Sequence, residues 1–486
     1  MNMRRFVMRS VLALCAPALM SVDRADASEC TADIDGSLVV DGIDLGTLLA
    51  NWSIPIGAPA CGGASPCAAD LNRDGTVDGI DFGILLAQWG PVPPIDIAVQ
   101  SIDQLLNGGN PHTLKVLYFG NSRVARHTGF AYDGVEEIAY QQGRLAGNGF
   151  IITRNYAGQT EFDTIYLAND GGGTGTTPTL GWEAVDPISM AHTHASTDGV
   201  GGISTATAGI ALIPNREFKI RALRKGLPLL PDDQPVTLTI QYLAGPGMGV
   251  FSVEPLDVTA NGVVVASHPV TMINASHDSY IVKWKHVEIP PSFGSIYHRT
   301  FRISGVSGNT TVFRANIGRD VANGIAISEM GCGGFGYPVQ ASPLTIYPNS
   351  WTEYVRAFDP DIAIWQYAAN QGASGVVAAT RQLMDRVESV NPNVVHIVCV
   401  DTPTPFLPLA LTEHSVQWAA QLQGYHDAIV VDPRSFLPDL FLTHASEQIY
   451  GLYFTDGYHE SRTGASVVAN AIWAALAEFV NEAGCR

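Results

Sequence analysis

The stretch Leu114-Lys115-Val116-Leu117-Tyr118-Phe119-Gly120-Asn121-Ser122 decides how the main part of this chain is expected to fold. Its apolar run is typical of a strand buried in a parallel sheet, and the strand ends in a turn that carries a serine. Further strands are expected at 362–365, 394–400 and 428–431, and helices at 134–145, 373–390 and 464–480. This alternation predicts an α/β fold, a doubly wound parallel sheet of the flavodoxin-like kind.

Residues 180–320 follow a different pattern, in which apolar and polar residues alternate and turn signals are frequent. A period of two is typical of strands that expose one face. We therefore expect an inserted antiparallel β domain, and a sandwich is the predicted form. Its strands are expected at 236–240, 263–265, 280–282 and 300–303.

Composition limits the classes of protein to which the chain can belong. Its 486 residues are more than one ordinary domain contains. Hydrophobic residues make up 46% of the chain and charged residues 15%, a composition that can form a large buried core. The formal net charge of −19 argues against nucleic acid or an anionic membrane as a partner. It suits a protein that binds cations.

The first 27 residues have the features of a secretory signal peptide. Arg4, Arg5 and Arg9 precede an apolar run from Val11 to Met20, and Ala25-Asp26-Ala27 offers a small-x-small cleavage site. We therefore expect a secreted protein that is cleaved near Ala27. No later apolar run is judged long enough to cross a bilayer, so no membrane span is expected.

An exported chain permits disulfides, and six cysteines remain after removal of Cys15 with the signal peptide. Three of them cluster near the mature N-terminus and are expected to hold one disulfide, namely Cys30, Cys61 and Cys67. For Cys332 and Cys399 we expect small, buried and unpaired side chains.

Residues 30–52 are repeated at 67–89 with an offset of 37 residues. In the second copy, oxygen-bearing side chains fall at loop positions 1, 3, 5, 9 and 12, and Gly75 occupies position 6, where a sharp turn is needed. The predicted Ca²⁺ ligands of this copy are Asp70, Asn72, Asp74, Thr76, Asp78 and Asp81. The first copy lacks the acid at position 5 and the glycine, so its site is expected to be weaker, with Asp33, Asp35, Asp41 and Asp44 as ligands.

This paired loop-helix pattern resembles the dockerin type I modules over about 60 residues. The resemblance implies two structural calcium sites and a possible cohesin-like protein partner. Pro91, Pro93 and Pro94 then predict a stiff linker. The expected organisation is a signal peptide (1–27), a dockerin-like module (28–90), a linker (91–112) and a catalytic domain (113–486).

Three short segments of the large domain fit one catalytic site. They are the turn at Ser122, Ala368-Ala369-Asn370-Gln371 after a second strand, and Asp456-Gly457-Tyr458-His459 near the C-terminus. A serine hydroxyl becomes a nucleophile when a neighbouring imidazole takes its proton, and a carboxylate then stabilises the imidazolium. Their order and their places after strands point to ester hydrolysis.

Over about 113–482 the chain resembles the SGNH hydrolases, also called GDSL esterases or lipases. The resemblance implies that Ser122 is the nucleophile, that Asp456 and His459 complete the triad, and that Asn370 donates to the oxyanion. For the glycine donor of the family we choose Gly334, and Gly158 is the competing choice.

The chain departs from the family pattern at three positions, because Asn121, Ala368 and Gln371 replace an Asp, a Gly and an Asp of the family. The favoured interpretation is a secreted serine esterase that removes short acyl groups, above all acetyl, from a polysaccharide. Two alternatives stay open. One is a lipase or lysophospholipase of the same fold, and the other is a non-catalytic carbohydrate-binding or assembly protein with a decayed hydrolase fold.

Overall fold

The computed structural model has two compact units, Met1–Val92 together with Asn481–Arg486, and Pro93–Val480. We call them the N-terminal unit and the main unit. The residues that the structure describes are 32–35, 39–53, 67–71, 74–91, 94–121, 124, 131–152, 182–184, 210–212, 214, 217–221, 223–224, 227–228, 235–258, 264–289, 298–308, 310–332, 337–341, 350–367, 375–404, 409–438 and 460–483.

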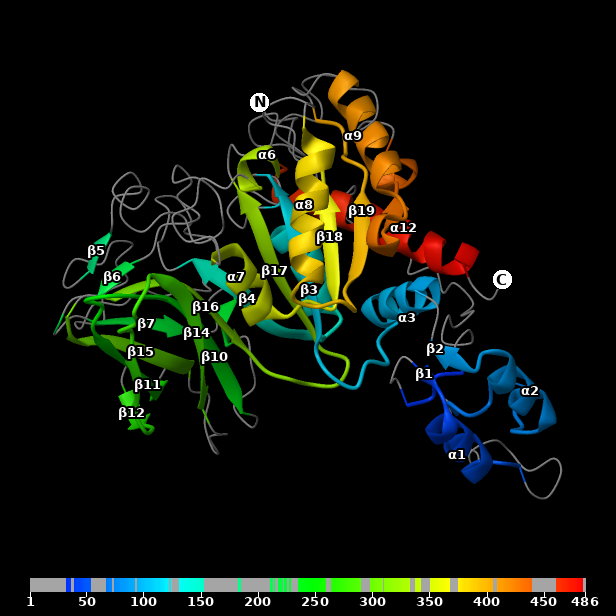
Figure 1. Ribbon diagram of the computed structural model, residues 1–486, viewed down its shortest axis with the longest axis horizontal. Helices are drawn as coiled ribbons and strands as arrows, with labels where there is room; N and C mark the ends of the chain where they lie inside the picture. The colour runs from blue at the N-terminus through cyan, green and yellow to red at the C-terminus, as the bar shows by residue number, and fades with distance from the viewer. Residues whose placement is uncertain are drawn as a thin grey trace, which may run out of the picture. The chain divides into compact units, whose positions relative to one another are not determined.

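Parallel strands form the centre of the main unit, in the order β4-β17-β3-β18-β19-β20 (Figure 1). Their bounds are β3 Leu114–Asn121, β4 Leu145–Ile152, β17 Ile325–Cys332, β18 Ile362–Gln366, β19 Val395–Cys399 and β20 Ile429–Val431. The predicted parallel sheet is confirmed. The central strand β3 is buried on both faces, as a strand between two helical layers must be.

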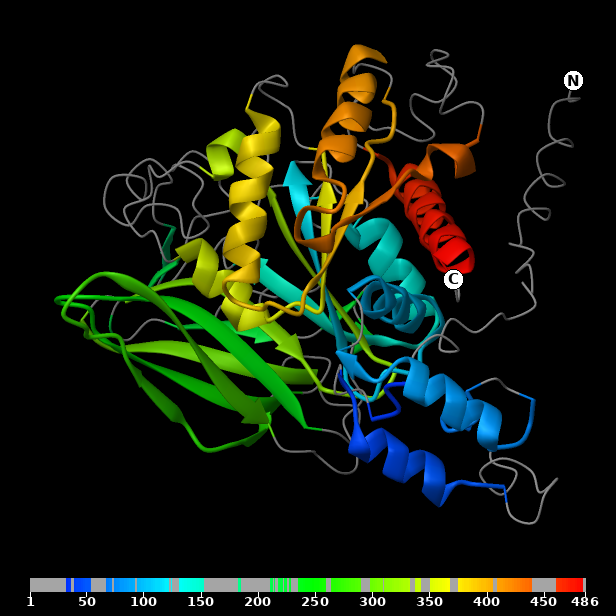
Figure 2. The same ribbon diagram turned by 45° about the vertical axis from the view of Figure 1, so that its right-hand side comes forward.

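Helices cover both faces of this sheet. One face packs against α6 (Tyr337–Gln340), α7 (Ser350–Phe358), α8 (Val376–Glu388) and α9 (Leu409–Leu422). The other carries α3 (Pro94–Asn107), the π-helical turn η3 (Ala131–Glu136), α4 (Glu137–Gln141) and α12 (Arg462–Ala483), and Figure 2 shows α8 and α12 on opposite sides. The 3₁₀ turns η5 (Tyr425–Asp427) and η6 (Pro433–Phe436) flank β20. The sheet is therefore doubly wound.

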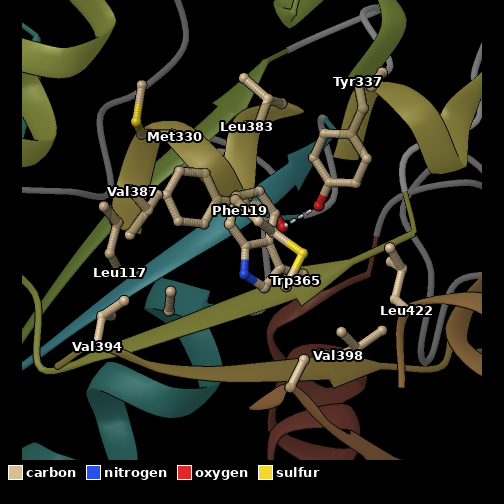
Figure 3. Close-up of a cluster of buried hydrophobic side chains, with 14 of the residues drawn as sticks. Leu117, Phe119, Met330, Tyr337, Trp365, Leu383, Val387, Val394, Val398 and Leu422 are labelled. Carbon is tan, nitrogen blue, oxygen red and sulfur yellow. Dashed lines mark hydrogen bonds between the residues drawn. The ribbon is translucent and has the colours of Figure 1, made fainter. Parts of the chain in front are cut away.

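The core of the α8 face is built on aromatic rings (Figure 3). Phe119 of β3 stacks on Trp365 of β18, with ring centroids 4.0 Å apart and ring planes 9° from parallel. Tyr337 packs edge-on to Trp365, and its hydroxyl lies 3.0 Å from the carbonyl oxygen of Phe119. Because Tyr337 is fully buried, this hydrogen bond satisfies a group that could not otherwise be solvated.

The β insertion consists of two antiparallel sheets, but the first of them is continuous with the parallel sheet. In the 11-stranded sheet, β16 (Thr310–Gly318) pairs antiparallel with β4, and β10 (Val236–Ala244) and β14 (Ile281–Ile289) follow. Two short strands, β5 (Trp182–Ala184) and β6 (Ile210–Leu212), extend it at β16.

The second sheet of the insertion faces the first. It consists of β7 (Glu217–Arg221), β11 (Val250–Val258), β12 (Val264–Ser267), β13 (Thr271–Asn274) and β15 (His298–Ser307), and a small pair is formed by β8 (Leu223–Arg224) and β9 (Leu227–Pro228). Tyr242 of the first sheet packs edge-on against Phe251 of the second, with ring centroids 5.3 Å apart. The expected sandwich arrangement is present, although it shares one of its sheets with the α/β fold.

The helix predicted at 134–145 is shorter than expected. Helical structure covers 131–141, and Leu145 already begins β4. Gly143 adopts a left-handed conformation with a φ of 70°, which ends the helix and turns the chain into the strand. The sequence pattern missed β4 because this strand contains two glycines, Gly147 and Gly149.

The stretch 91–112, expected to be a linker, instead contains the helix α3. Proline is tolerated in the first helical turn, so Pro94 starts this helix rather than preventing it. The buried residues follow a helical period, namely Ala98, Val99, Ile102, Leu105 and Leu106. The stretch therefore belongs to the core of the main unit.

The sequence analysis found no later apolar run long enough to cross a bilayer, and the helix α12 departs from this expectation. Within α12, Thr463–Asn481 has a mean hydropathy of 1.4 over its most apolar window and is long enough to cross a bilayer by length and composition. Alanine-rich helices reach such values without a continuous run of large apolar residues. Half of this window is buried inside the fold, and Val468, Ile472 and Leu476 pack in the core.

The helix that follows β3 and the helix that ends the chain touch through a glycine. A Cβ at Gly134 would lie 2.4 Å from the carbonyl oxygen of Ala465 and 2.5 Å from the Cβ of Ala469, both in the first turns of α12. Only a residue without a side chain permits this approach. The start of α12 is thus held against the segment that follows the β3 turn.

The N-terminal unit repeats one element twice. Helices α1 (Gly42–Ala50) and α2 (Gly79–Ala87) each begin with an aspartate cap and a reciprocal capping box, formed by Asp41 with Asp44 and by Asp78 with Asp81. The strands β1 (Val39–Val40) and β2 (Gly90–Pro91) pair antiparallel. Two hydrogen bonds link the two copies: the N–H of Ser53 donates to the carbonyl oxygen of Val77, and the N–H of Val77 donates to the hydroxyl oxygen of Ser53.

Two of the expectations for cysteines are confirmed, those for Cys399 and for a disulfide in the N-terminal cluster. Cys399 is free and buried at the end of β19. Cys67 is disulfide-bonded, and the other cysteines of the N-terminal cluster, Cys30 and Cys61, lie outside the described residues.

A buried histidine anchors β19 beneath the aromatic core. Trp365 donates a hydrogen bond of 2.9 Å from its indole nitrogen to Nδ1 of His396, so the proton of the neutral ring is on Nε2. That nitrogen lies 3.2 Å from a carboxylate oxygen of Glu388. Burial lowers the pKa of His396 below its ordinary value of 6.5, and the opposing effect of Glu388 does not compensate.

The neutral state of His396 predicts a loss of stability in mild acid. Because its pKa is lower in the folded protein, the unfolded chain binds more protons as the pH falls through 6.5, and stability falls with it. We expect the Tm to decrease between about pH 7.5 and about pH 5.5, and His396→Gln, which still accepts from Trp365, to reduce this decrease. His277→Gln, on a surface turn, is the control. Equal slopes in His396→Gln and the wild type would contradict the prediction.

The contact at Gly134 predicts a second loss of stability. Gly134→Ala places a methyl group against the α12 backbone, and such overpacking costs about 1–3 kcal/mol. Thermal and urea unfolding should both show the decrease. Gly83→Ala in α2 is the control, because a Cβ there meets nothing within 4 Å and alanine favours a helix. A Gly134→Ala protein as stable as the wild type would show that α12 is free to shift.

Candidate active site

The carboxyl edge of the parallel sheet is where the predicted catalytic segments begin. Strand β3 lies between β17 and β18, with Asn121 paired in register with Cys332 and Phe119 with Trp365. The segments expected to carry Ser122, Gly334 and Asn370 therefore leave three adjacent strands at the same edge.

The chain order makes β3 a point where the sheet changes direction. After β3 the chain builds β4 and then β17 on one side, and it crosses to β18, β19 and β20 on the other. In open α/β sheets, ligands bind outside the carboxyl ends of the strands at such a point. The topology of the sheet thus predicts a binding site at the carboxyl end of β3.

The end of β3 is tightly packed. A Cβ at Gly120 would lie 2.5 Å from Cγ2 of Val124, whose side chain is fully buried. The side chain of Val124 therefore covers Gly120. A glycine is needed directly before the predicted nucleophile turn because a side chain would displace Val124.

Both ends of the segment after β17 are anchored beside β3. Cys332 is the register partner of Asn121, and the hydroxyl of Tyr337 lies 3.0 Å from the carbonyl oxygen of Phe119 and 2.5 Å from that of Gln366. By contrast, β4, which precedes the alternative donor Gly158, is separated from β3 by β17.

The start of α12 packs against η3 through the contact of Gly134 with Ala465, and η3 in turn contacts β17. Ala465 follows the predicted base, His459, by only six residues (465 − 459). Ser122, Gly334, Asn370, Asp456, His459 and the alternative Gly158 themselves lie outside the described residues.

Two polar residues at this edge were missed by the sequence analysis. Gln366, the last residue of β18, donates a hydrogen bond of 2.9 Å to the carboxylate of Asp401, which follows β19 and is 6% exposed. Burial, with a further effect of Asp401, raises the pKa of the adjacent Tyr367 to about 12. Polar residues directly after apolar strands were the available signal for both. Gln366 and Asp401 therefore form a buried, hydrogen-bonded pair next to the segment that carries Asn370.

The candidate calcium loops of the N-terminal unit have closely similar geometry. Asp44 accepts from the backbone N–H groups of Ile34 and Asp41, and Asp81 accepts from those of Leu71 and Asp78 at the equivalent positions. Oxygens of Asp33, Asp35 and Asp44 lie within 4.8 Å of one another. Such a cluster of carboxylates is the donor set that Ca²⁺ prefers, so the residues of the first loop fit this ion.

In the second loop, backbone N–H groups also hold the acids in place. Gly75 donates to Asp70, and Thr76 donates to Asp74 through its N–H and its hydroxyl. Gly75 has a φ of 89°, which only glycine adopts without strain. Asn72, the predicted ligand at position 3, lies outside the described residues.

Comparison with known proteins places the fold. No family model matches the chain, and no curated protein matches it. Among solved structures, a peptidoglycan O-acetylesterase is similar over 79% of this chain and 96% of its own, with a TM-score of 0.51 and 13% identity.

Two carbohydrate esterases match less of the chain. A family two enzyme from Cellvibrio japonicus has 11% identity and a TM-score of 0.26, and the match covers 57% of this chain and 93% of that one. A family 3 enzyme from Talaromyces cellulolyticus has 17% identity and a TM-score of 0.24, with 32% and 72% covered. At these identities the likeness concerns the fold alone. Over 79% of its length the chain thus shares its overall fold with the peptidoglycan O-acetylesterase.

Proposed function

We propose that this protein is a secreted serine esterase that hydrolyses short acyl esters, above all acetyl esters, on a polysaccharide. The observation that carries the proposal is the common origin of three predicted catalytic segments at the carboxyl ends of β3, β17 and β18. The contact between Gly134 and α12 supports the approach of the fourth segment, which holds Asp456 and His459.

In the proposed mechanism, the hydroxyl oxygen of Ser122 attacks the ester carbonyl while His459 takes its proton. Asp456 accepts a hydrogen bond from the other ring nitrogen and stabilises the imidazolium. The carbonyl oxygen becomes an oxyanion, to which the side-chain amide of Asn370 and backbone N–H groups donate. His459 then protonates the leaving alcohol, and water releases the acid from Ser122 by the same steps in reverse.

The backbone donors proposed for the oxyanion are Ser122 and Gly334. The anchoring of Cys332 and Tyr337 beside β3 supports Gly334 over Gly158, because its segment begins and ends next to the nucleophile strand. A donor helps only when it is held in place before the charge develops. The buried pair Gln366–Asp401 would hold the neighbouring Asn370 segment in the same way.

Two further observations bear on substrate and compartment. The similarity in fold to a peptidoglycan O-acetylesterase favours an acetyl ester on a glycan over a long-chain lipid. The charged n-region, apolar run and Ala25-Asp26-Ala27 support export. A lipase of the same fold, or a decayed and non-catalytic relative, is the outcome if the tests below fail.

Labelling with a fluorophosphonate tests the proposal, because only an activated serine reacts. We expect the wild type to be labelled at Ser122 and Ser122→Ala not to be labelled. Asn370→Ala should remain folded but lose about a hundredfold or more in turnover of an acetyl ester, as expected for a lost oxyanion donor. No labelling of the folded wild type would support the non-catalytic relative. Fatty acid release from phospholipid, without acetate release from acetylated xylan or peptidoglycan, would support the lipase.

We also propose that the N-terminal unit is a calcium-stabilised docking module with a cohesin-like partner. The carboxylate cluster of Asp33, Asp35 and Asp44 supports the calcium sites. The two helices also expose apolar side chains at equivalent positions, with Ile43 62% and Ile80 57% exposed. Leu49 and Leu86, which occupy equivalent positions of the two copies, are exposed as well. Such duplicated apolar exposure is typical of a binding surface.

Calcium should stabilise the N-terminal unit. An ion at a hundred times its Kd adds about 2.7 kcal/mol, so Ca²⁺ should raise the Tm and EGTA should reverse the rise. Asp35→Asn and Asp74→Asn should each weaken the binding of one ion in calorimetry, and the exposed Asp278→Asn in the β insertion should not. Binding curves that are the same for all of these proteins, or a Tm that does not respond to Ca²⁺, would exclude the calcium sites.

A further inference from the structure

A pocket of about 510 Å³ lies on the main unit at the junction of the β insertion and the amino ends of the parallel strands. We call it the junction pocket. Thr237, Thr239, His286, Glu288 and Asn316 of the insertion line one side. Lys115 at the start of β3, Asp361 just before β18, and Phe358 at the end of α7 line the other.

The insertion side is a polar face of the first sheet of the insertion. Thr239 is paired in register with His286 on β14 and with Asn316 on β16, so the three side chains form one row across three strands. The alternate residues Leu238 and Ile240 are fully buried on the opposite face, where the two sheets of the insertion meet. A strand in this position would be expected to present apolar residues to α7 as well.

Several buried polar atoms on this face have no hydrogen-bond partner among the described residues. Thr239 is 5% exposed, and its hydroxyl bonds to Nδ1 of His286 at 2.7 Å, so Nε2 of that ring is not used in this bond. The amide oxygen of Asn316 is buried and has no hydrogen-bond partner within the described part of the chain. The same holds for both amide atoms of the fully buried Gln241, two residues beyond Thr239 on β10. Buried groups of this kind normally have partners.

Charges of both signs face the pocket. Lys115 and Arg319 contribute positive charges, and Glu288, Asp320 and Asp361 contribute carboxylates. One oxygen of Asp361 accepts a hydrogen bond of 2.7 Å from the N–H of Lys115, and Asp320 pairs with His112. Burial lowers the pKa of His286, and the neighbouring Lys115 and Lys285 lower it further, so the ring is neutral at neutral pH. An anion would meet the three carboxylates, and a cation would meet Lys115 and Arg319.

A neutral, hydroxyl-rich molecule fits this mixture. Each hydroxyl both donates and accepts, so it can donate to Glu288 or the Asn316 oxygen and accept from Lys115. An apolar ligand would leave these groups without partners, at a cost of about 1–3 kcal/mol for each. The volume is within the range of pockets that hold small molecules.

The pocket is far from the candidate catalytic edge. Lys115 is the second residue of β3 and Asn121 the last, and six residues of strand span about 20 Å. A ligand in the junction pocket is therefore not the ester that reacts. A polymer, however, can reach both places at once.

We propose that the junction pocket is a second saccharide-binding site, which holds a sugar residue of the polysaccharide away from the residues that react. The nature of the polymer rests on the proposed function. Binding in the pocket does not, because it requires no turnover. Holding a chain at two places raises its effective concentration at the catalytic edge.

Chemical footprinting tests the site on the full-length wild-type protein. Diethyl pyrocarbonate modifies neutral, accessible imidazoles, and mass spectrometry gives the rate at each histidine. Millimolar xylohexaose, cellohexaose or hexa-N-acetylchitohexaose should slow the modification of His286, which lines the pocket and is exposed. His277, on a surface turn of the same insertion, should react at an unchanged rate. If none of the three oligosaccharides slows His286, or if His277 is slowed equally, the proposal is overturned.

A pair of neighbouring variants gives an independent measurement. His286→Ala should weaken binding of the protecting oligosaccharide about tenfold or more in calorimetry, a loss of about 1.4 kcal/mol. Lys285→Ala is the matched control, because alternation along the strand places its side chain on the other face of β14 and it is also exposed. Unchanged binding in His286→Ala would overturn the site. Protection of His286 in a protein that the fluorophosphonate does not label would leave the site standing and remove the esterase.

Discussion

The burial of β3 on both faces is the constraint on which the main unit depends. Val116 and Tyr118 face one helical layer, and Leu117 and Phe119 face the other, all without solvent exposure. A strand of this kind must be hydrogen-bonded on both edges, and β17 and β18 provide those partners. Everything that follows β3 at its carboxyl end is placed relative to these two neighbours.

The aromatic core transmits this placement to the segments at the edge. The stack of Phe119 on Trp365 sets the register of β3 against β18, and the hydroxyl of Tyr337 joins both strands to the helix after β17. On the opposite face, Gly134 lets α12 approach within backbone contact. The proposed site would thus be assembled by rigid elements, and its loops would only have to supply the side chains.

The β insertion extends the α/β sheet, so its position relative to the catalytic edge is fixed by hydrogen bonds rather than by a linker. The β16–β4 pairing carries this connection. It also creates the junction pocket, since the polar face of β10 meets the amino ends of β3 and β18 only because the sheets are continuous. One continuous sheet would therefore present a reacting edge and a holding site to the same polysaccharide.

The sequence by itself determined the strands β3, β18, β19 and β20 of the parallel sheet, the helices at α8 and α12, the β-rich nature of the insertion and the duplicated loops of the N-terminal unit. These features have local causes, namely hydrophobic period, turn residues and helix caps. It also led to the catalytic residue types, which stay predictions. Only the tertiary structure decided that β17 lies beside β3, that the supposed linker is the core helix α3, that the insertion joins the sheet, and that Gln366 meets Asp401. Strand partners and close contacts join residues far apart in the chain, up to 331 positions for Gly134 and Ala465 (465 − 134). Backbone hydrogen bonds do not depend on residue type, so the sequence does not say which strands pair. Packing of the whole chain selects among them.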